Sequence, residues 1–301
     1  MARARRKGGA GRHTGSGVAA VHAVVCIKQV PDTTELRINP ETGTLVREGV
    51  VSIINPYDVH ALEAALQFKD RYGGEVTVIT MGPPSFVQSL RRALAMGADR
   101  AILISDRAMA AADTFATSRV LAEAILKIQR EIAPVDIVLC GRQTIDADTG
   151  QVGPGIAARL DWPVLTYVMA IRSVDWERRE IVVERKLERS RQVVWSRLPA
   201  VLTVEKELNE PRYASLRRML EAARMPILTW NKDDLGLQRH EVGLLGSPTI
   251  VAKSYVKPPV ERQRVVIDAR HDPDAAVEEL VERLFQEEKF REVVLGGGGG
   301  R

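Results

Sequence analysis

The chain contains 301 residues, 45% of them hydrophobic and 27% charged, so it is long enough to bury a sizeable core and unlike an intrinsically disordered sequence. Its net charge of +4 is accounted for by five arginine and lysine residues among the first twelve positions, so the charge does not indicate a nucleic-acid partner. No segment is apolar for long enough to insert directly in a membrane.

Residues 1–20 are rich in glycine, serine and arginine, which predicts a disordered basic tail. The tail lacks the apolar segment of a secretory signal, so we expect a cytoplasmic protein, although its basic, acid-free composition also fits an organelle transit segment. Cys26 and Cys140 have neither metal-site nor redox-motif spacing. Each lies in an apolar run, where we expect a buried thiol rather than a reactive one.

Short apolar, β-branched runs alternate with segments of helical spacing in the first half of the chain. The predicted strands are residues 21–30, 75–80, 100–105 and 136–140, and the predicted helices are residues 58–72, 85–95 and 117–132. Helical connections join parallel strands, so these elements predict a doubly wound α/β fold of Rossmann-like type, with a mostly parallel sheet and helices on both faces. A small hairpin is expected between Asp32 and Asn55.

Apolar and polar residues alternate after Trp162, which predicts antiparallel strands added to the main sheet. These strands are expected at residues 166–173, 181–186 and 192–196, with residues 201–204 following them. A basic amphipathic helix is expected at residues 215–223, then an extended stretch to about Pro259, a charged helix at residues 273–288 and a glycine-rich tail. The segment after residue 226 therefore resembles an arm rather than a second domain.

The sharpest local pattern is the glycine-rich run at residues 141–154, which follows the strand predicted at residues 136–140. The carboxyl end of a parallel strand, followed by glycines and a helix start, suits a phosphate or pyrophosphate group. Asp148 or Thr149 could cap the helix predicted from Gly155. The same residues would also suit a helix-capping turn that binds nothing.

Two further turns lie at strand-to-helix junctions, at residues 55–58 and 80–83. If all three turns meet at one edge of the sheet, they form a nucleotide cradle, although each sequence is also typical of ordinary turns. The chain lacks a Walker A motif and a Rossmann glycine motif at the first turn, which excludes a standard NTPase. Asp146 and Asp148 could act as an acid–base pair, but loop hydrogen bonds are the expected role.

Several motifs in chain order resemble those of electron-transfer flavoprotein beta subunits, from about Val21 to Met225. They are V-C-I-K-Q-V-P-D at residues 25–32, I-N-P-Y-D at 54–58, M-G-P at 81–83, A-L-A-M-G-A-D-R at 93–100, G-R-Q-T-I-D-A-D-T-G-Q-V-G-P at 141–154, L-P-A-V-L-T at 198–203 and N-E-P-R-Y-A-S-L at 209–216. The resemblance implies a heterodimer with an FAD-bearing alpha subunit and a nucleotide held between strand ends. In ordinary members this nucleotide is a structural AMP.

The loops at residues 55–58 and 149–154, and the tail at residues 234–237 and 241–248, are most similar to the electron-bifurcating branch, which includes the nitrogen-fixation-associated proteins. In that branch a second FAD accepts a hydride from NADH and sends electrons toward a quinone or dehydrogenase and a low-potential ferredoxin or flavodoxin. The alternatives are a non-bifurcating beta subunit with AMP, and a non-redox ATP- or AMP-binding module. Ala147 stands where this branch usually has glycine.

The resemblance also implies site residues, by position. The cofactor would be contacted by Cys26, Asn55, Pro56, Tyr57, Asp58, Met81, Gly82, Gly141, Arg142, Gln143, Thr144, Ile145, Asp146, Ala147, Asp148, Thr149, Gly150, Gln151 and Val152. Partner docking would involve Asn209, Glu210, Arg212, Tyr213 and Leu216. The resemblance implies no catalytic side chain and no metal ligand.

Three regions follow from the resemblance and the pattern together. Residues 21–204 form the nucleotide- or flavin-binding domain, residues 205–226 the partner-recognition loop and helix, and residues 227–301 the C-terminal arm. Leu216 would enter a pocket on an electron-exchanging acyl-CoA dehydrogenase or quinone oxidoreductase. Without the resemblance, the helix around Leu216 would be interpreted as an ordinary amphipathic helix packed on this chain or on the alpha subunit.

Overall fold

The computed structural model describes residues 20–32, 51–252 and 264–295, and the chain divides into two units, residues 1–254 and 255–301. Nearly all of the predicted basic tail, the middle of the hairpin after Asp32 and the glycine-rich tail lie outside the described residues.

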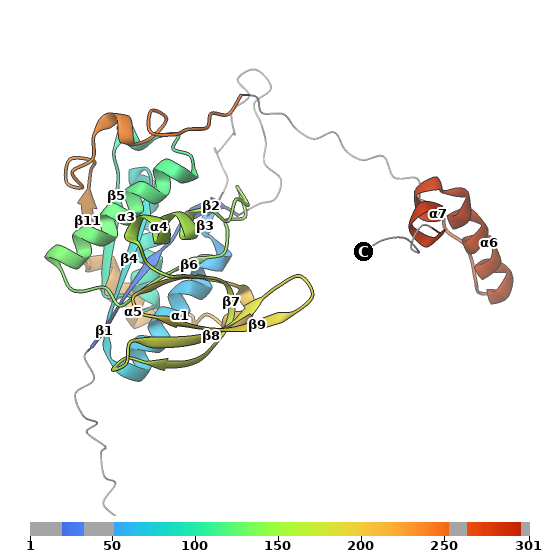
Figure 1. The fold of residues 1–301 in the computed structure, drawn as a ribbon, viewed down its shortest axis with the longest axis horizontal. Coiled ribbons are helices and arrows are strands. Elements are labelled where there is room, and N and C mark those ends of the chain that lie inside the picture. Colours follow the sequence, from blue (N-terminus) through green and yellow to red (C-terminus); the bar gives the residue numbers. More distant parts are fainter. Residues whose placement is uncertain (1–19, 33–50, 253–263, 296–301) are drawn as a thin grey trace, which may run out of the picture. The chain divides into compact units, whose positions relative to one another are not determined.

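The first unit is built on a nine-stranded sheet in the order β11-β5-β4-β1-β6-β10-β7-β8-β9 (Figure 1). Its strands are β1 Val21–Cys26, β4 Gly74–Met81, β5 Arg100–Ile104, β6 Ile137–Gly141, β7 Val164–Asp175, β8 Glu180–Lys186, β9 Arg191–Arg197, β10 Ala200–Val204 and β11 Leu228–Trp230. Neighbours from β11 to β7 are parallel, and only the β7–β8 and β8–β9 pairs are antiparallel. The predicted mostly parallel sheet with antiparallel additions is confirmed.

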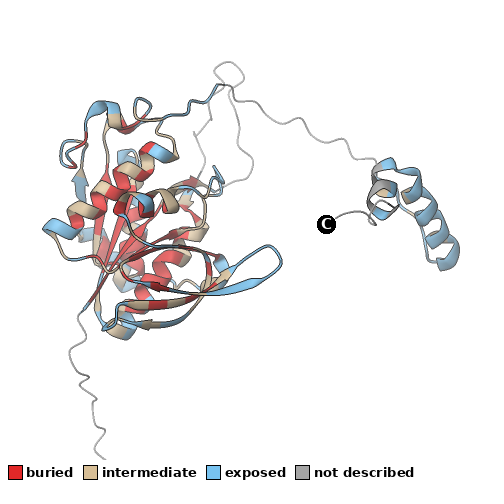
Figure 2. Ribbon diagram, viewed as in Figure 1, coloured by how far each residue is buried: buried red, intermediate tan, exposed pale blue. Residues whose placement is uncertain are grey.

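Helices cover both faces of the sheet, as the strand–helix alternation predicted. They are α1 Pro56–Tyr72, α2 Val87–Met96, α3 Thr114–Glu131, α4 Val152–Leu160 and α5 Leu216–Arg224, with short 3-10 turns η1 Pro84–Phe86, η2 Arg107–Met109, η3 Lys206–Leu208 and η4 Arg239–Glu241. One apolar cluster joins α1, α2 and α5 to one face, and a second joins α3 and α4 to the other. Figure 2 shows the buried residues concentrated in the sheet and on the helix faces that meet it.

The central strand β1 shows why the core forms between these layers. All six of its residues are buried, with Val25 in the first apolar cluster and Val24 and Cys26 in the second. Alternate residues of a strand point to opposite faces, so the apolar run at residues 23–26 serves both layers. Burial of side chains such as Leu62 and Leu66 in α1 stabilises the fold by about 1.5–3 kcal/mol each.

Two short strands branch off after β1. They are β2 Gln29–Pro31 and β3 Ser52–Ile54, which pair antiparallel with Gln29 opposite Ile54. The run predicted as one strand at residues 21–30 is therefore divided between β1 and β2, and β3 lies within the region predicted as a hairpin, most of which is outside the described residues. Asn55 then begins α1, where Pro56 occupies the first helical position that its fixed φ angle favours.

Two parts of the sequence interpretation need correction. β10 follows the antiparallel strands in the chain, but it lies between β6 and β7 and is parallel to both. The stretch expected to be extended up to about Pro259 contains β11, which adds a parallel strand beside β5, and η4. Leu235, Leu237 and Val242 are buried in the second apolar cluster because this stretch packs against the domain.

The second unit consists of α6 Pro273–Gln286 and α7 Glu288–Leu295. The carboxylate of Asp272 accepts a hydrogen bond from the Ala275 N–H at 3.0 Å and caps α6. A single helix was predicted here, but Glu287 interrupts it. Across the described parts of both units, we find no helix with the length and hydropathy needed to cross a lipid bilayer.

Candidate nucleotide site and docking segment

The three turns singled out in the sequence lie at one edge of the sheet. In the parallel register, Cys26 of β1 lies opposite Ile79 of β4 on one side and Cys140 of β6 on the other. The turns after β4 and β6 therefore leave the sheet beside the end of β1. We call the turns at residues 55–58 and 81–82 together with the loop at residues 141–152 the strand-end cradle.

The first turn of α1 is bonded directly to the loop after β6. Asn55 Nδ2 donates to the Gln143 carbonyl at 2.9 Å, and Asn55 Oδ1 accepts from the Ile145 N–H at 3.2 Å. Asp58 accepts from the Lys28 N–H at 2.8 Å and from the Gly141 N–H at 2.9 Å. Both side chains are buried. They hold the turns together, and contact of either side chain with a nucleotide stays a prediction.

Burial changes the acidity of Asp58 and of the two cysteines beside it. Loss of solvent raises the pKa of Asp58 to about 7, against the lowering effect of hydrogen bonds from Lys28, Asn55 and Gly141. Burial also raises the pKa of the Cys26 and Cys140 thiols, and the charge of Asp58 adds to the effect. The two thiols are therefore apolar filling beneath the cradle, as predicted for them from their apolar surroundings.

Two glycines allow the cradle to close tightly over the sheet. A methyl group at Gly141 would lie 2.4 Å from Asp58 Oδ1 and 2.5 Å from Tyr57 Cβ. At Gly153 it would lie 2.4 Å from Thr203 Cγ2 and 2.9 Å from Cys140 Sγ. Only glycine permits this approach. The start of α4 consequently rests on the ends of β6 and β10.

The start of α4 differs from the prediction. The helix begins at Val152 rather than Gly155, and Gln151 occupies its N-cap position without a side-chain cap. Asp148, which we expected as a possible cap along with Thr149, instead accepts a hydrogen bond from Gln143 Nε2 at 2.8 Å. The first N–H groups of a helix have no partner within the helix, so an uncapped start can bind an anionic group.

The rest of the loop is held by an ion pair and by two left-handed residues. Lys28 Nζ lies 2.7 Å from Asp146 Oδ2, and this contact lowers the pKa of Asp146 against the raising effect of its partial burial. Positive φ angles occur at Asp148 and Gly150, at 53° and 64°. Ala147 is not among the left-handed residues, so its methyl group does not hinder the loop.

The remaining predicted cofactor residues lie around the same edge. Met81 and Val152 pack against the second apolar cluster, and Gly82 donates its N–H to the Ile104 carbonyl at 3.0 Å. The loop also carries Thr144, Ile145, Asp146, Ala147 and Thr149, which are half-buried or exposed. The structure therefore brings all the predicted cofactor residues to the cradle, and contact with a cofactor remains a prediction for each.

A stack of cations and aromatic rings borders the cradle on the β10 side. The Arg142 guanidinium lies 5.1 Å from the centre of the Tyr57 ring and 5.6 Å from that of Tyr167. Arg142 Nη1 also pairs with Glu205 Oε1 at 2.8 Å. Although partial burial opposes it, the Glu205 contact raises the pKa of Arg142. Lys206 Nζ also lies 4.8 Å from the centre of the Tyr57 ring.

The sequence interpretation missed Tyr167, Glu205 and Lys206 in this stack. Glu205 and Lys206 follow β10, and Tyr167 lies near the start of β7, beside the carboxyl end of β10 in the register of the two strands. β10 lies between β6 and β7 in the sheet although it follows β9 in the chain. Tyr167 has a φ angle of 57°, which is a strained conformation for an aromatic residue. The only available signal was the place of Glu205 and Lys206 after a predicted strand.

The predicted docking residues fall into two groups. Asn209 and Arg212 anchor the segment to α1, because Asn209 Nδ2 donates to the His60 carbonyl at 3.0 Å and Arg212 Nε pairs with Glu63 Oε2 at 2.8 Å. Glu210 is exposed, and Tyr213 and Leu216 are 98% and 74% exposed. Asn209 and Arg212 therefore fix the backbone from which Tyr213 and Leu216 project.

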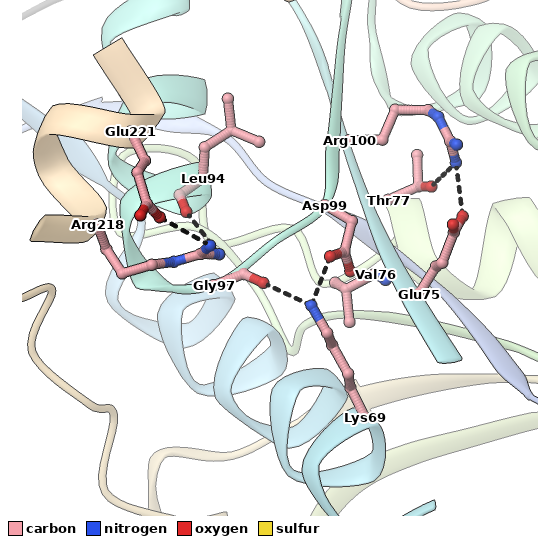
Figure 3. Close-up of polar contacts among 10 residues, drawn as sticks. All are labelled: Lys69, Glu75, Val76, Thr77, Leu94, Gly97, Asp99, Arg100, Arg218 and Glu221. Atoms are coloured by element: carbon pink, nitrogen blue, oxygen red, sulfur yellow. Dashed lines mark hydrogen bonds and ion pairs between the residues drawn. The ribbon is translucent and has the colours of Figure 1, made fainter. Parts of the chain in front are cut away.

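α5 follows this segment and lies against α2. Arg91 Nη1 of α2 donates to the Ala222 carbonyl at 2.6 Å, and Figure 3 shows Arg218 of α5 reaching the Leu94 carbonyl near the end of α2, at 3.5 Å. A groove of about 830 Å³ between the helices is lined in part by Arg91, Tyr213 and Met219. Ala222 is the only buried residue of α5, so the packing leaves most of its apolar side chains uncovered.

The chain is similar in sequence to several known proteins. A family model described as the electron transfer flavoprotein domain matches residues 42–235. Protein FixA of Bradyrhizobium diazoefficiens is 46% identical over 266 residues, covering 88% of this chain and 91% of that protein. The caffeyl-CoA reductase-Etf complex subunit CarD of Acetobacterium woodii is 51% identical over 236 residues (78% and 87%). The electron transfer flavoprotein subunit beta of Thermoanaerobacterium thermosaccharolyticum is 49% identical over 267 residues (88% and 98%).

Proposed function

Because the chain belongs to the electron transfer flavoprotein family, we propose that it is the beta subunit of a heterodimer and that its strand-end cradle holds FAD. The observation that carries this proposal is the bonding of Asn55 and Asp58 to the loop after β6. These bonds hold the first part of the loop that leads to the uncapped start of α4, at the carboxyl edge of a parallel sheet. This is the place where open α/β sheets bind nucleotides.

The donors around the cradle suit a phosphate-bearing ligand. The first turn of α4 offers main-chain N–H groups and the positive end of the helix dipole. Lys28 is already paired with Asp146 of the loop, and Arg142, within the loop, is already paired with Glu205. Main-chain groups would therefore bind the phosphates, while the two ion pairs keep the loop in shape.

The cofactor would carry out the redox chemistry, and the protein would hold the cofactor in position. When bound, FAD supplies the capacity to take a hydride from NADH and to release electrons singly toward a quinone or dehydrogenase and toward ferredoxin or flavodoxin. Asn55 and Asp58 fix the loop, and the stack of Tyr57, Arg142 and Tyr167 continues the bonded surface beyond it. A dinucleotide, which is longer than AMP, would make use of that additional surface.

The relatives favour the same choice. The loops at residues 55–58 and 149–154, which resemble the bifurcating branch, lie within residues 42–235 that match the family model, and FixA proteins and the CarD subunit are among the similar proteins. The name of CarD places it in a complex of an Etf with a reductase, which supports an oxidoreductase as partner for this chain also. AMP in the same cradle, in a non-bifurcating beta subunit, is the alternative.

We propose further that residues 209–216, which lead into the start of α5, dock an electron-exchanging partner. Tyr213 and Leu216 project from a backbone that Asn209 and Arg212 fix to α1, so their position does not depend on the partner. Met219 is also half uncovered, at 50% exposure. An exposed apolar group on a rigid support is typical of an interface anchor. An acyl-CoA dehydrogenase or a quinone oxidoreductase is the partner we expect.

Cofactor quantification tests the proposal. The chain should be purified together with its alpha subunit, and the released FAD and AMP should be measured per heterodimer. Two FAD are expected. One FAD and one AMP would reject bifurcation and favour the AMP-binding alternative, and a chain that binds ATP and never co-purifies with an alpha subunit would favour a non-redox module. The Leu216→Ala variant is a matched control, because it should have unchanged cofactor content.

A further inference from the structure

The motif at residues 241–248 packs on the N-terminal end of α3. Leu244 donates its N–H to the Ala110 carbonyl at 3.1 Å, just before α3 begins. Arg119 of α3 forms an ion pair with Glu241. Val242 is fully buried in the second apolar cluster. We call residues 238–249 the clasp.

The clasp is closely fitted to this position. Gly243 has a φ angle of 57°, and a methyl group there would lie 2.0 Å from the Ala108 carbonyl oxygen. A methyl group at Gly246 would lie 2.3 Å from the backbone carbon of Glu241. Any other residue at either glycine would force main-chain atoms apart. The contact between the clasp and the start of α3 is therefore fixed in register.

Asp113 joins the clasp to α3. It is the N-cap residue of α3, and its Oδ1 accepts from the Ala116 N–H at 2.9 Å. Its Oδ2 accepts from the Thr249 N–H at 3.1 Å and from Thr249 Oγ1 at 2.8 Å. Its own N–H donates to Ser247 Oγ at 2.8 Å. Both carboxylate oxygens are used, one within the helix and one toward the clasp.

α3 in turn contacts the strand-end cradle. Thr114, the first residue of α3, donates from Oγ1 to Gln151 Oε1 at 2.8 Å. Gln151 occupies the N-cap position of α4, inside the cradle loop. One turn further, a methyl group at Gly155 would lie 2.6 Å from Ser118 Oγ, so the two helices touch where they begin. A continuous path thus runs from the clasp to the residues that begin α4.

We propose that the clasp positions the cradle, with Thr249 and Asp113 fixing the start of α3 and Thr114 thereby holding Gln151 where α4 begins. This inference rests on the proposed binding of a flavin nucleotide at the cradle. Thr249 itself is exposed and lies outside the cradle. It is a positioning residue, and its loss should weaken cofactor binding through the start of α4 rather than through a lost contact with the cofactor.

The test uses the heterodimer and FAD. Thr249→Ala removes the hydroxyl's hydrogen bond to the Asp113 carboxylate and should weaken FAD binding by roughly three- to tenfold. Thr249→Ser keeps the hydroxyl and should restore the affinity of the unchanged protein. The melting temperature of the FAD-free protein should change little, because Thr249 is exposed. Thr229→Ala, at an exposed residue of β11 outside the path, should leave FAD binding unchanged.

A double-mutant cycle tests the path itself. Thr114→Val removes the hydrogen bond to Gln151 and should weaken FAD binding as Thr249→Ala does. Because both residues act through the start of the same helix, the FAD affinity of the double variant should be only slightly lower than that of the single variant that binds FAD less tightly. Fully additive losses, unchanged binding in Thr249→Ala or no rescue by serine would each overturn the inference. If the unchanged heterodimer binds only the alpha subunit's FAD, the proposed function fails and the clasp inference with it.

Discussion

Replacing Asp58 with asparagine should change how stability depends on pH. Asp58 is 4% exposed, and burial raises its pKa from an ordinary 3.8 to about 7. The folded protein therefore holds the Asp58 proton more tightly than the unfolded chain does. This contribution to the free energy of unfolding is fully present below pH 3.8, and it is lost as the pH rises through about 7.

The size of the effect follows from the two pKa values. A difference of about three, at about 1.4 kcal/mol for each unit, corresponds to about 4 kcal/mol between acidic and neutral pH. Asparagine at position 58 is uncharged at every pH and resembles the protonated acid in shape. As the pH is raised, the free energy of unfolding of the variant should therefore increase by about 4 kcal/mol relative to that of the unchanged protein.

Urea unfolding of the nucleotide-free chain, measured from about pH 4 to about pH 8, gives this difference directly. Asp161→Asn, at an exposed residue that ends α4, is the matched control and should follow the unchanged protein across the range. A difference between Asp58→Asn and the unchanged protein that is flat in pH would refute the reasoning. It would mean that the N–H groups of Lys28 and Gly141 outweigh the cost of burying the charge.

Further substitutions test the docking segment, the loop and the stack. Leu216→Ala should change the free energy of unfolding by less than about 0.5 kcal/mol because the side chain is 74% exposed. The variant should keep its FAD content and exchange electrons more slowly with the dehydrogenase in stopped-flow measurements. Loss of FAD would show that the docking segment is misassigned. Asp146→Ala and Lys28→Met break the same 2.7 Å ion pair, so both should reduce FAD retention equally in equilibrium dialysis. Each should change the free energy of unfolding by less than about 1 kcal/mol. Unequal losses of FAD would assign one of the two residues a separate role. Arg142→Met leaves the buried Glu205 charge unpaired and should lower the free energy of unfolding, measured in urea, by about 3–5 kcal/mol. Adding Glu205→Gln should restore much of the lost stability. No recovery in the double variant would contradict the pairing.

The sequence predicted the layers of the fold because they depend on local patterns. The apolar run of β1 and the helical spacing of α1 are visible within single segments, and parallel pairing follows from their alternation. β11 was missed because three residues are too few to show a period. α4 was predicted to start late because Gly153 and Pro154 in its first turn hide the helical pattern.

The cradle was predictable as a place but not as a set of bonds. Turns that follow parallel strands meet at one edge, so residues near Asn55 and Gly141 could be expected together. The side chains of Asn55 and Asp58 form hydrogen bonds with the loop. Whether such bonds form depends on differences in distance of a few tenths of an ångström, which cannot be predicted from the sequence pattern. Glu205 was missed because β10 inserts between β6 and β7, and chain order gives no sign of this.

The central claim is that this chain binds FAD through the turns that meet at the ends of β1, β4 and β6. Hydrogen–deuterium exchange of the chain with and without FAD tests it most directly, because amides covered by a ligand exchange more slowly. We expect protection at residues 55–58 and 141–155, with residues 209–220 unchanged. Protection confined to the groove between α2 and α5, or no protection after β6, would contradict the account.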